Sequence, residues 1–196
     1  NCILDTSEST ERRAVVRRVL VRECQAVSCA TRGVVFQDCT VENSYASDLF
    51  LPQGCAFTHV TLKGHVGRMM LGSSLSSVPT EVVEAFDRAN AEIYRQVDWA
   101  LDIREIDADE LEIRNIPAAL IKRDPERHVV FQRSRLGNAA WREMDLRGTG
   151  LNVWLDDLAT YGPADAVFVI PDRHARRGKI NEAVRELKRR GIAELD

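Results

Sequence analysis

The most constraining feature of the sequence is a five-residue period that begins at Ala14 and runs to Met69. When the chain is cut every five residues, with one extra residue at Gly54, apolar side chains fall in the first and third places of almost every piece. The exceptions in those places are Thr31, Ser44, His65 and Gly67. The fourth and fifth places are polar, Gly or Pro, apart from Val27 and Met69.

Neither common secondary structure explains this period, because a helix repeats its buried face every 3.6 residues and a strand every two. A chain that turns a corner every five residues satisfies it. Four sides then make a coil of about 20 residues, with two inward side chains on each side, and the coils stack at the usual strand spacing of about 4.8 Å. In such a solenoid each unit buries its apolar face against its neighbours.

Several pieces carry a resemblance to a known family. Residues 55–59 (CAFTH) and 34–38 (VVFQD) place a small or short side chain two positions before a central Phe, and residues 2–6 (CILDT) place Cys2 before Leu4 in the same way. This arrangement resembles pentapeptide-repeat proteins and covers about residues 14–71. The resemblance implies a short right-handed quadrilateral β-solenoid (β-helix) with a general role in protein interaction.

The remainder of the chain lacks the period and predicts a small α/β or α+β domain. We therefore divide the chain into a solenoid at residues 1–74, a capping or linking helix at 75–99 and an α/β domain at 100–196. Val82, Phe86, Ala89 and Ile93 have helical spacing, and such a helix could lie across the end of the solenoid.

Within the predicted α/β domain, the segment 118–133 predicts a hairpin that turns at Asp124–Glu126. Residues 151–162 predict a short helix. A buried strand at 167–170 precedes a helix whose stripe ends before Gly191, a residue suited to a helix C-terminus. That helix stripe comprises Ile180, Ala183, Val184 and Leu187.

Every cysteine lies in the N-terminal part of the chain, at or before Cys55, and fits the small-residue column of the period. The cysteines are Cys2, Cys24, Cys29, Cys39 and Cys55. An odd count argues against a secreted disulfide framework and favours the cytoplasm. A zinc site that adds His59 or His65 is the alternative, but these spacings match no zinc motif. We expect core thiols, no metal site and no cofactor.

The best-placed polar cluster is Pro171-Asp172-Arg173-His174, which follows a buried-type strand and precedes a helix. Ligands of open α/β sheets bind beyond the carboxyl ends of strands. Asp172 and His174 are therefore the candidate catalytic residues, as a general acid–base pair or as metal ligands. A polar loop with a turn proline is the alternative. Asp172 with Glu186-Leu187-Lys188 also resembles a metal-dependent nuclease pattern, but those last residues fall on a helix with Leu187 on its buried stripe.

The same region is strongly basic, although the whole chain has a formal net charge of −3. Such a patch attracts phosphate groups. A solvated helix face whose last turn suits the helix dipole is the alternative, and no aromatic residues for base stacking alternate with the charges. The candidate ligand-binding residues are Arg173, Arg176, Arg177, Lys179, Arg189 and Arg190.

These patterns favour a non-catalytic protein-interaction or regulatory protein, with another protein as its partner. The alternative is an enzyme or binder that acts on nucleic acid or a phosphorylated ligand through the C-terminal domain. Some long acidic pentapeptide-repeat proteins resemble DNA and bind topoisomerases. Residues 14–70 here contain six basic and four acidic residues, which does not favour that mimicry. No apolar run approaches the roughly 20 residues that span a bilayer, so no membrane partner is expected, and a homodimer is left open.

Overall fold

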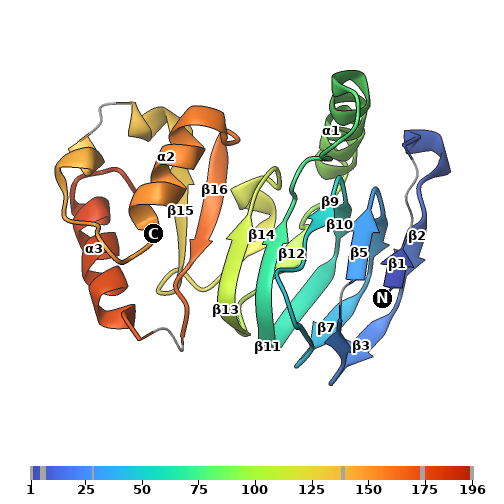
Figure 1. Cartoon of the computed structure of the whole chain (residues 1–196), viewed down its shortest axis with the longest axis horizontal. Helices are drawn as coiled ribbons and strands as arrows, with labels where there is room; N and C mark the ends of the chain where they lie inside the picture. The colour runs from blue at the N-terminus through green and yellow to red at the C-terminus, as the bar shows by residue number, and fades with distance from the viewer. Residues whose placement is uncertain (1, 5–7, 28, 138–139, 173–174, 195–196) are drawn as a thin grey trace.

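The structure is a computed structural model that describes residues 2–4 (backbone only), 8–27, 29–137, 140–172 and 175–194. It is a mixed α/β fold in which parallel sheets make up one part and helices gather mainly in the other (Figure 1). The strands of the described residues are Cys2–Leu4 (β1), Val15–Arg17 (β2), Leu20–Arg22 (β3), Gln25–Ala26 (β4), Cys29–Arg32 (β5), Val35–Gln37 (β6), Thr40–Glu42 (β7), Tyr45–Ala46 (β8), Pro52–Gln53 (β9), Ala56–Thr58 (β10), Val60–Leu71 (β11), Leu101–Asp102 (β12), Ile106–Ile113 (β13), Ile121–Lys122 (β14), His128–Gln132 (β15) and Asp165–Val169 (β16).

Three α-helices are found among the described residues: Thr80–Arg95 (α1), Leu151–Tyr161 (α2) and Arg177–Arg189 (α3). The 3-10 helices there are Thr10–Arg12 (η1), Ala118–Leu120 (η2), Arg133–Leu136 (η3) and Ala140–Glu143 (η4). The predicted helices at α1, α2 and α3 are therefore confirmed, with small differences at their ends.

Short parallel strands stack at the interval that the period predicts. Val15 on β2 lies beside Val35 on β6, which is one coil of four five-residue pieces further along the chain. Val35 lies in turn beside Ala56 on β10, after a coil lengthened by the extra residue Gly54. Strands β3, β7 and the start of β11 repeat both steps, and β4 and β8 repeat the first. We call β2–β5 the first rung, β6–β9 the second, and β10 with β11 the third.

Residues in the fifth place of the period turn the chain between strands. Backbone φ is +55° at Arg18, +54° at Asp38 and +53° at His59, which stack above one another at one corner. Glu23 and Asn43 have the same left-handed conformation at the next corner, with φ of +53° and +45°. Because this region is unfavourable for β-branched and bulky apolar residues, the fifth place is polar or glycine as far as Gly64.

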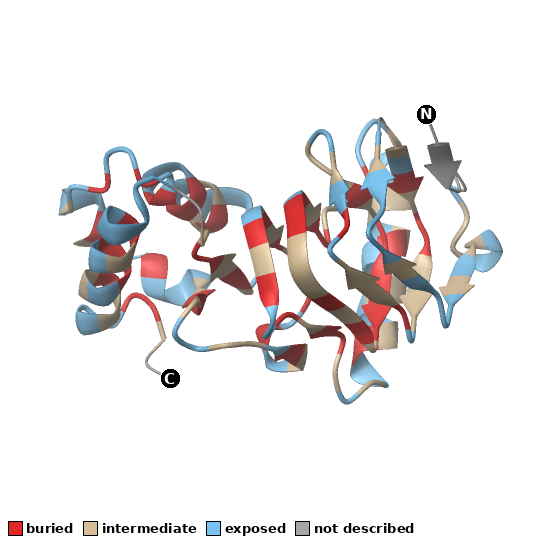
Figure 2. Ribbon diagram, turned by 90° about the horizontal axis from the view of Figure 1, so that it is seen from below, coloured by how far each residue is buried: buried red, intermediate tan, exposed pale blue. Residues whose placement is uncertain are grey.

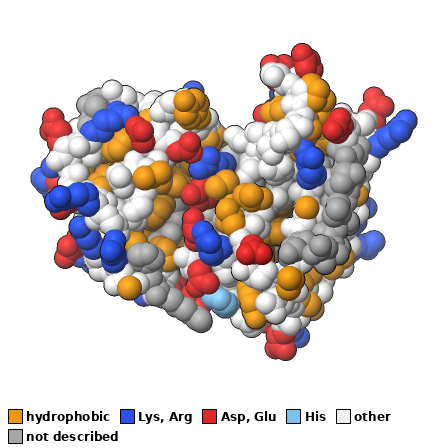
Figure 3. Space-filling model, viewed as in Figure 1, with side chains coloured by type: hydrophobic (Ala, Val, Ile, Leu, Met, Phe, Trp, Pro, Cys, Tyr) orange, Lys and Arg blue, Asp and Glu red, His pale blue; other side chains and the backbone are white. Residues whose placement is uncertain are grey.

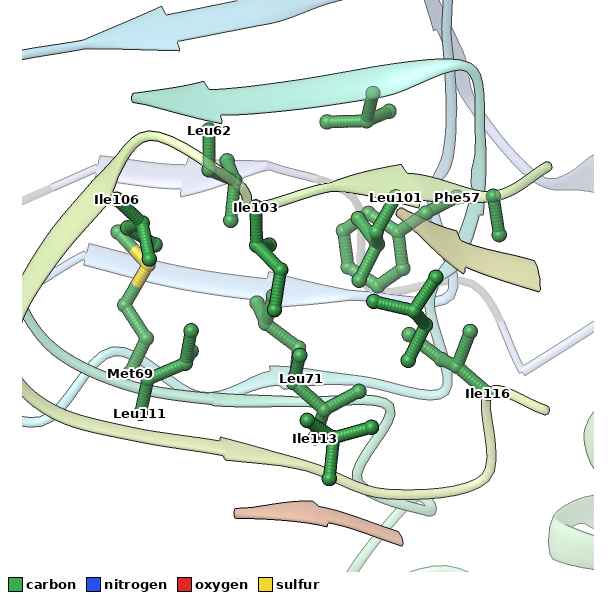
Figure 4. Close-up of a cluster of buried hydrophobic side chains, with 14 of the residues drawn as sticks. Phe57, Leu62, Met69, Leu71, Leu101, Ile103, Ile106, Leu111, Ile113 and Ile116 are labelled. Atoms are coloured by element: carbon green, nitrogen blue, oxygen red, sulfur yellow. The ribbon is translucent and has the colours of Figure 1, made fainter. Parts of the chain in front are cut away.

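Side chains of the first and third places fill the space between the sheets. The rings of Phe36 and Phe57, one rung apart, are stacked with centroids 5.6 Å apart. Figure 4 shows that later strands point their aliphatic side chains into the same interior. The labelled residues there are Phe57, Leu62, Met69, Leu71, Leu101, Ile103, Ile106, Leu111, Ile113 and Ile116.

Parallel stacking continues across the boundary drawn near residue 75. Leu101 on β12 pairs with Val60 on β11, and Ile121 on β14 pairs with Leu101 after another step of one coil. β13 also pairs in parallel with β11. Helix α1 is thus an excursion between two rungs of one sheet system. We call residues 14–122 the parallel stack and residues 123–194 the C-terminal unit.

The hairpin predicted around Asp124 is wrong. The chain does turn there, since the amides of Arg127 and His128 donate to the Asp124 carbonyl. However, β14 pairs with β12 at one edge of the eight-stranded sheet, whereas β15 pairs antiparallel with β16 at the other. Periodicity identifies strands but does not identify their neighbours.

The inward positions predicted at His65 and Gly67 are also wrong. The register between β11 and β13 shifts on both sides of Gly67, and this irregularity moves the inward position to Val66, which is fully buried. Met69, expected to point outward, is buried and points into the interior in Figure 4. The local bulge changes the phase of the pattern.

Helix α1 lies along the side of the stack. The Arg13 guanidinium lies over the Phe86 ring at 5.1 Å, close to the first rung. Near its other end, the Phe57 amide donates to the Tyr94 hydroxyl at 3.4 Å, next to the third rung. The helix therefore spans successive rungs and does not cover the N-terminal end, where exposed residues are plain in Figure 2.

The C-terminal unit has its own buried core and closes the other end of the stack. β16 pairs antiparallel with β13, so the sheet runs into this unit. The Trp154 ring meets Phe131 and Phe168 edge-on, at 5.2 and 5.3 Å between centroids. The helix stripe predicted on α3 is buried throughout.

Candidate functional site

Asp172 follows β16 and faces two arginines. Its Oδ2 forms an ion pair with Nη1 of Arg127, and its Oδ1 pairs with Nη2 of Arg177 at 2.9 Å. The side chain is only 22% exposed, and each of its oxygens already accepts from a guanidinium. Asp172 therefore holds segments of the chain together, which favours the polar-loop interpretation over a catalytic one.

Arg127 connects this loop to the parallel stack. Besides Asp172, its Nε contacts Oδ2 of Asp124 at 3.1 Å, and its Nη2 donates to the carbonyls of Arg104 (3.2 Å) and Ile106 (2.9 Å). These partners come from the turn before β15, the loop after β16 and the corner before β13. One planar guanidinium thus joins three segments in the way that its fixed donor geometry allows.

Arg173 and His174 lie outside the described residues, so the pairing of Asp172 with His174 stays a prediction. Across the part of the chain that the structure describes, no three His, Cys, Asp or Glu side chains are grouped as a metal ion requires. Glu186 does not join Asp172, because it is held by Arg189 and Arg190. These two arginines lower the pKa of Glu186 to about 2.

The basic residues of α3 and the loop before it are divided between its two ends. Arg176 donates to the Gly148 carbonyl at 3.1 Å, and Lys179 donates to the Arg147 carbonyl at 2.8 Å. Arg189 and Arg190 lie at the opposite end of the helix, about 15–20 Å away at a rise of about 1.5 Å per residue. The predicted ligand-binding residues in the described part therefore do not form one cluster.

A hollow of about 470 Å³ adjoins this region, between β13 and the loop before α2. Arg176 and the Gly148–Gly150 loop line one side of it. Asp109, Glu110 and Glu112 line the other side. Acidic side chains repel a phosphate group. The hollow therefore does not favour the phosphorylated ligand that the sequence analysis offered as an alternative.

A second hollow, of about 670 Å³, lies between α1 and the segment that leads into η2. Figure 3 shows the molecule indented between α1 and the C-terminal unit. Asp87 and Asn90 from α1 line this hollow together with Leu120. Partial burial raises the pKa of Asp87, whose carboxylate accepts a hydrogen bond from the Ser74 hydroxyl at 3.3 Å. No group of catalytic residues converges here in the described part of the chain.

His128 is fully buried at the start of β15. Its Nδ1 accepts a hydrogen bond from the Asp124 amide at 2.9 Å, which places the proton on Nε2 in the neutral ring. Nε2 is buried and has no hydrogen-bond partner among the described residues. Burial, reinforced by the neighbouring Arg127, lowers the pKa of His128 to about 4. His128 lies opposite Val169 at one end of the antiparallel β15–β16 pair.

Outward charged residues one rung apart form ladders, which the sequence analysis above does not predict. Glu42 on the second rung lies between Arg22 on the first (2.9 Å) and Lys63 on the third (3.7 Å). Each pair is separated by one coil of the chain, so opposite charges at the coil interval are the signal that would have found them. The sign of the charge alternates from rung to rung.

A second ladder contains His59. Its Nδ1 lies 3.2 Å from Oδ1 of Asp38, and its Nε2 lies 2.8 Å from Oδ1 of Asp98. The His59 ring also contacts Trp99, over which the Lys122 ammonium lies at 3.7 Å. The hydrogen bond with Asp98, and then that with Asp38, raises the pKa of His59.

The cysteines fit the core interpretation only in part. Cys39 and Cys55 are buried, but Cys29 is partly exposed and Cys24 is exposed, because both belong to the first rung. All four are free thiols. The side chain of Cys2 lies outside the description.

Comparison of the chain with models of known protein families, with curated proteins and with solved structures gives no match. Among the described residues, none of the helices combines the length and apolar character needed to cross a lipid bilayer. The functional argument therefore depends on the geometry of the chain itself.

Proposed function

We propose that this chain is a non-catalytic protein-interaction or regulatory protein, built on a right-handed quadrilateral β-solenoid similar to those of pentapeptide-repeat proteins. The observation that carries the proposal is the regular parallel stacking of strands that are one coil apart in the chain. Stacked strands with residues held at left-handed corners present outward side chains at fixed spacing, which suits recognition of another protein's surface.

The distribution of polar residues also supports a binding function. Outward columns contain alternating charges, such as Arg22, Glu42 and Lys63, at the strand spacing. By contrast, the carboxylate of Asp172 is engaged by two arginines within the fold. Asp172 is thus committed to internal contacts, whereas the charged columns of the stack face outward.

The proposal is tested by photo-cross-linking the full chain in an extract of its own organism. A photoreactive amino acid replaces Thr40 or Thr61 on one outward column, or Arg185 on the exposed side of α3 as the matched position outside the stack. We expect adducts of one discrete mass from the column positions. Adducts confined to Arg185 would instead favour a ligand of the C-terminal unit, and absence of adducts from every stack position would contradict the proposal.

The catalytic alternative is tested with Asp172→Asn. If the residue is structural, this variant lowers thermal stability and leaves cross-linking by the folded protein unchanged. A hydrolytic activity on nucleic acid or phosphate esters that wild type has and folded D172N lacks would overturn the non-catalytic assignment.

A further inference from the structure

The first rung of the parallel stack has an uncovered edge. β2, β3 and β4 each end their sheets in the described part of the chain, while β5 alone is followed outward by another strand, β1. Val15 on β2 is 53% exposed and Leu20 on β3 is 56% exposed. Both side chains lie on the outer face of the rung, and Val19, at an inward position of the same rung, is 40% exposed.

Backbone groups on this edge are directed outward at alternate residues. The Val19 carbonyl accepts from Thr40, and the Glu23 amide donates to Glu42, so these residues face the second rung. Because successive residues of a strand direct their amide and carbonyl groups to opposite sides, Leu20 and Arg22 direct theirs away from the stack. Val15 and Arg17 do the same on β2, since Ala14 and Arg18 bond to the second rung.

The charge on this edge is positive. The ladder through Glu42 ends on Arg22 at the first rung. Arg17 and Arg18 are exposed, and neither has a carboxylate within salt-bridge distance among the described residues. As the charges of the Arg22–Glu42–Lys63 ladder alternate in sign, a further rung in register would place an acidic side chain next to Arg22, and the charge of Arg17 and Arg18 favours acidic side chains as well.

We propose that an acidic segment of a partner protein adds to β2 and β3 as the next rung and turns where these two strands meet at the Arg18 corner. Its backbone pairs with the outward groups of Val15, Arg17, Leu20 and Arg22. Because Leu20 and Arg22 lie on one face of β3, and Val15 and Arg17 on one face of β2, the segment carries an apolar and an acidic side chain two residues apart on that face of each strand. This inference rests on the proposed interaction function and specifies where and what the chain binds.

A second copy of this chain fits the edge less well, because it would place the same arginines opposite one another, and like charges directly opposed are unfavourable. Arginines on an edge strand also discourage edge-to-edge aggregation. Protection against aggregation predicts no preference for an acidic strand. A binding measurement therefore distinguishes it from recognition of an acidic partner segment.

The test uses the full chain with short capped peptides of the pattern Val-Val-Glu-Asn-Ala-Val-Val-Glu (the Val/Glu peptide) or the same pattern with Lys in place of Glu (the Val/Lys peptide), which place Val and the charged residue two apart on one face. We expect the Val/Glu peptide to bind, as measured by fluorescence anisotropy of a labelled copy. Hydrogen exchange should slow at the amides of Leu20 and Arg22, with no change on the third rung. The Val/Lys peptide should bind several-fold more weakly.

Two variants sharpen the test. Arg17→Glu should weaken the Val/Glu peptide by about threefold to fivefold, the range of an exposed ion pair, and improve binding of the Val/Lys peptide. Arg185→Glu is the matched control, because Arg185 is also exposed, without a salt-bridge partner in the described residues, and changes the net charge equally. Leu20→Pro removes an outward N–H, so it should abolish peptide protection while thermal unfolding shows the fold intact.

Equal binding of the two peptides, absence of exchange protection, or displacement of the acidic peptide by a short single-stranded oligonucleotide would overturn the inference. Concentration-dependent dimerisation that is lost in Leu20→Pro would assign the edge to a second copy and equally overturn it. Discrete photo-cross-links from Thr40 or Thr61 would still stand in each case, so the two proposals fail separately.

Discussion

The two ends of the parallel stack differ in how their last strands are covered. At the C-terminal end, β13 pairs with β16, and Ile113 beside Val167 is fully buried. At the N-terminal end, β2 and β3 end their sheets among the described residues, and Val19, at an inward position, is 40% exposed. The comparison teaches that a periodic sequence specifies the stacking of its rungs but not the closure of its ends. At the C-terminal end, aperiodic chain supplies β16 as the cover of β13.

The largest difference between the ends is expected from truncating one aliphatic side chain at each. Ile113→Ala should lower the free energy of unfolding by about 3 kcal/mol, because it leaves a cavity between β13 and β16. Leu20→Ala, at the uncovered end, should change it by less than about 0.5 kcal/mol. Urea unfolding followed by circular dichroism measures both. Similar losses in the two variants would show that the N-terminal end is covered in solution.

Acid should weaken the covered end through His128. Its pKa is lowered to about 4 in the folded protein and is about 6.5 in an unfolded chain. The unfolded state therefore takes up the proton first, and stability falls as the pH drops from 6.5 to about 4, by about 3 kcal/mol at about 1.36 kcal/mol for each pKa unit. Above pH 6.5 this contribution is absent.

His128→Asn is the comparison variant, because its side-chain oxygen can still accept from the Asp124 amide. Between about pH 7 and pH 4.5 wild type should lose more stability than this variant, by about 2 kcal/mol in urea titrations. Parallel losses would contradict the buried neutral histidine. Arg127, Arg123 and Asp124 are the charged neighbours that affect this pKa.

Removal of Arg127 should have the next largest effect, because it leaves Asp172 and two backbone carbonyls without their shared donor. We expect Arg127→Ala to cost about 2 kcal/mol and Arg127→Lys to recover less than half of it, since lysine lacks the fork of donors. Arg185→Ala serves as the exposed control and should be neutral. If Arg127→Ala lowered the free energy of unfolding no more than Arg185→Ala does, the Arg127 guanidinium would not be a link between the parallel stack and the C-terminal unit.

The smallest effect is expected at His59, on the side of the stack. Its pKa is raised by Asp98 and Asp38, so its stabilising contribution is fully present below pH 6.5 and is lost as the pH rises through the folded-state pKa. The ring is a third exposed, and solvent screening limits the effect to under about 1 kcal/mol. His59→Asn, which tolerates the left-handed corner, should remove the pH dependence, and about 1 M salt should reduce it. NMR titration of the imidazole and urea unfolding on either side of neutral pH provide the measurements.

Much of the local structure could be predicted from the residues. The coil interval, the corners at Asp38 and Asn43 and the buried stripe of α3 all follow from side-chain pattern, because each depends on neighbours close in sequence or on a repeat. The bulge beside Gly67 could not be predicted, since it depends on the register with β13, a strand that lies beyond α1 in the chain. Of the candidate site, Asp172 was identified, but its role depended on Arg127, which no motif indicated.

The sequence by itself determined that residues 14–62 stack in parallel with two inward side chains in every five, because burial and left-handed corners repeat at that interval. Only the tertiary structure decided that β12 and β14 extend the same sheet after α1, that Asp172 is held by arginines, and that β16 covers β13. These features arise from contacts between segments far apart in the chain, whose free energies no local pattern encodes.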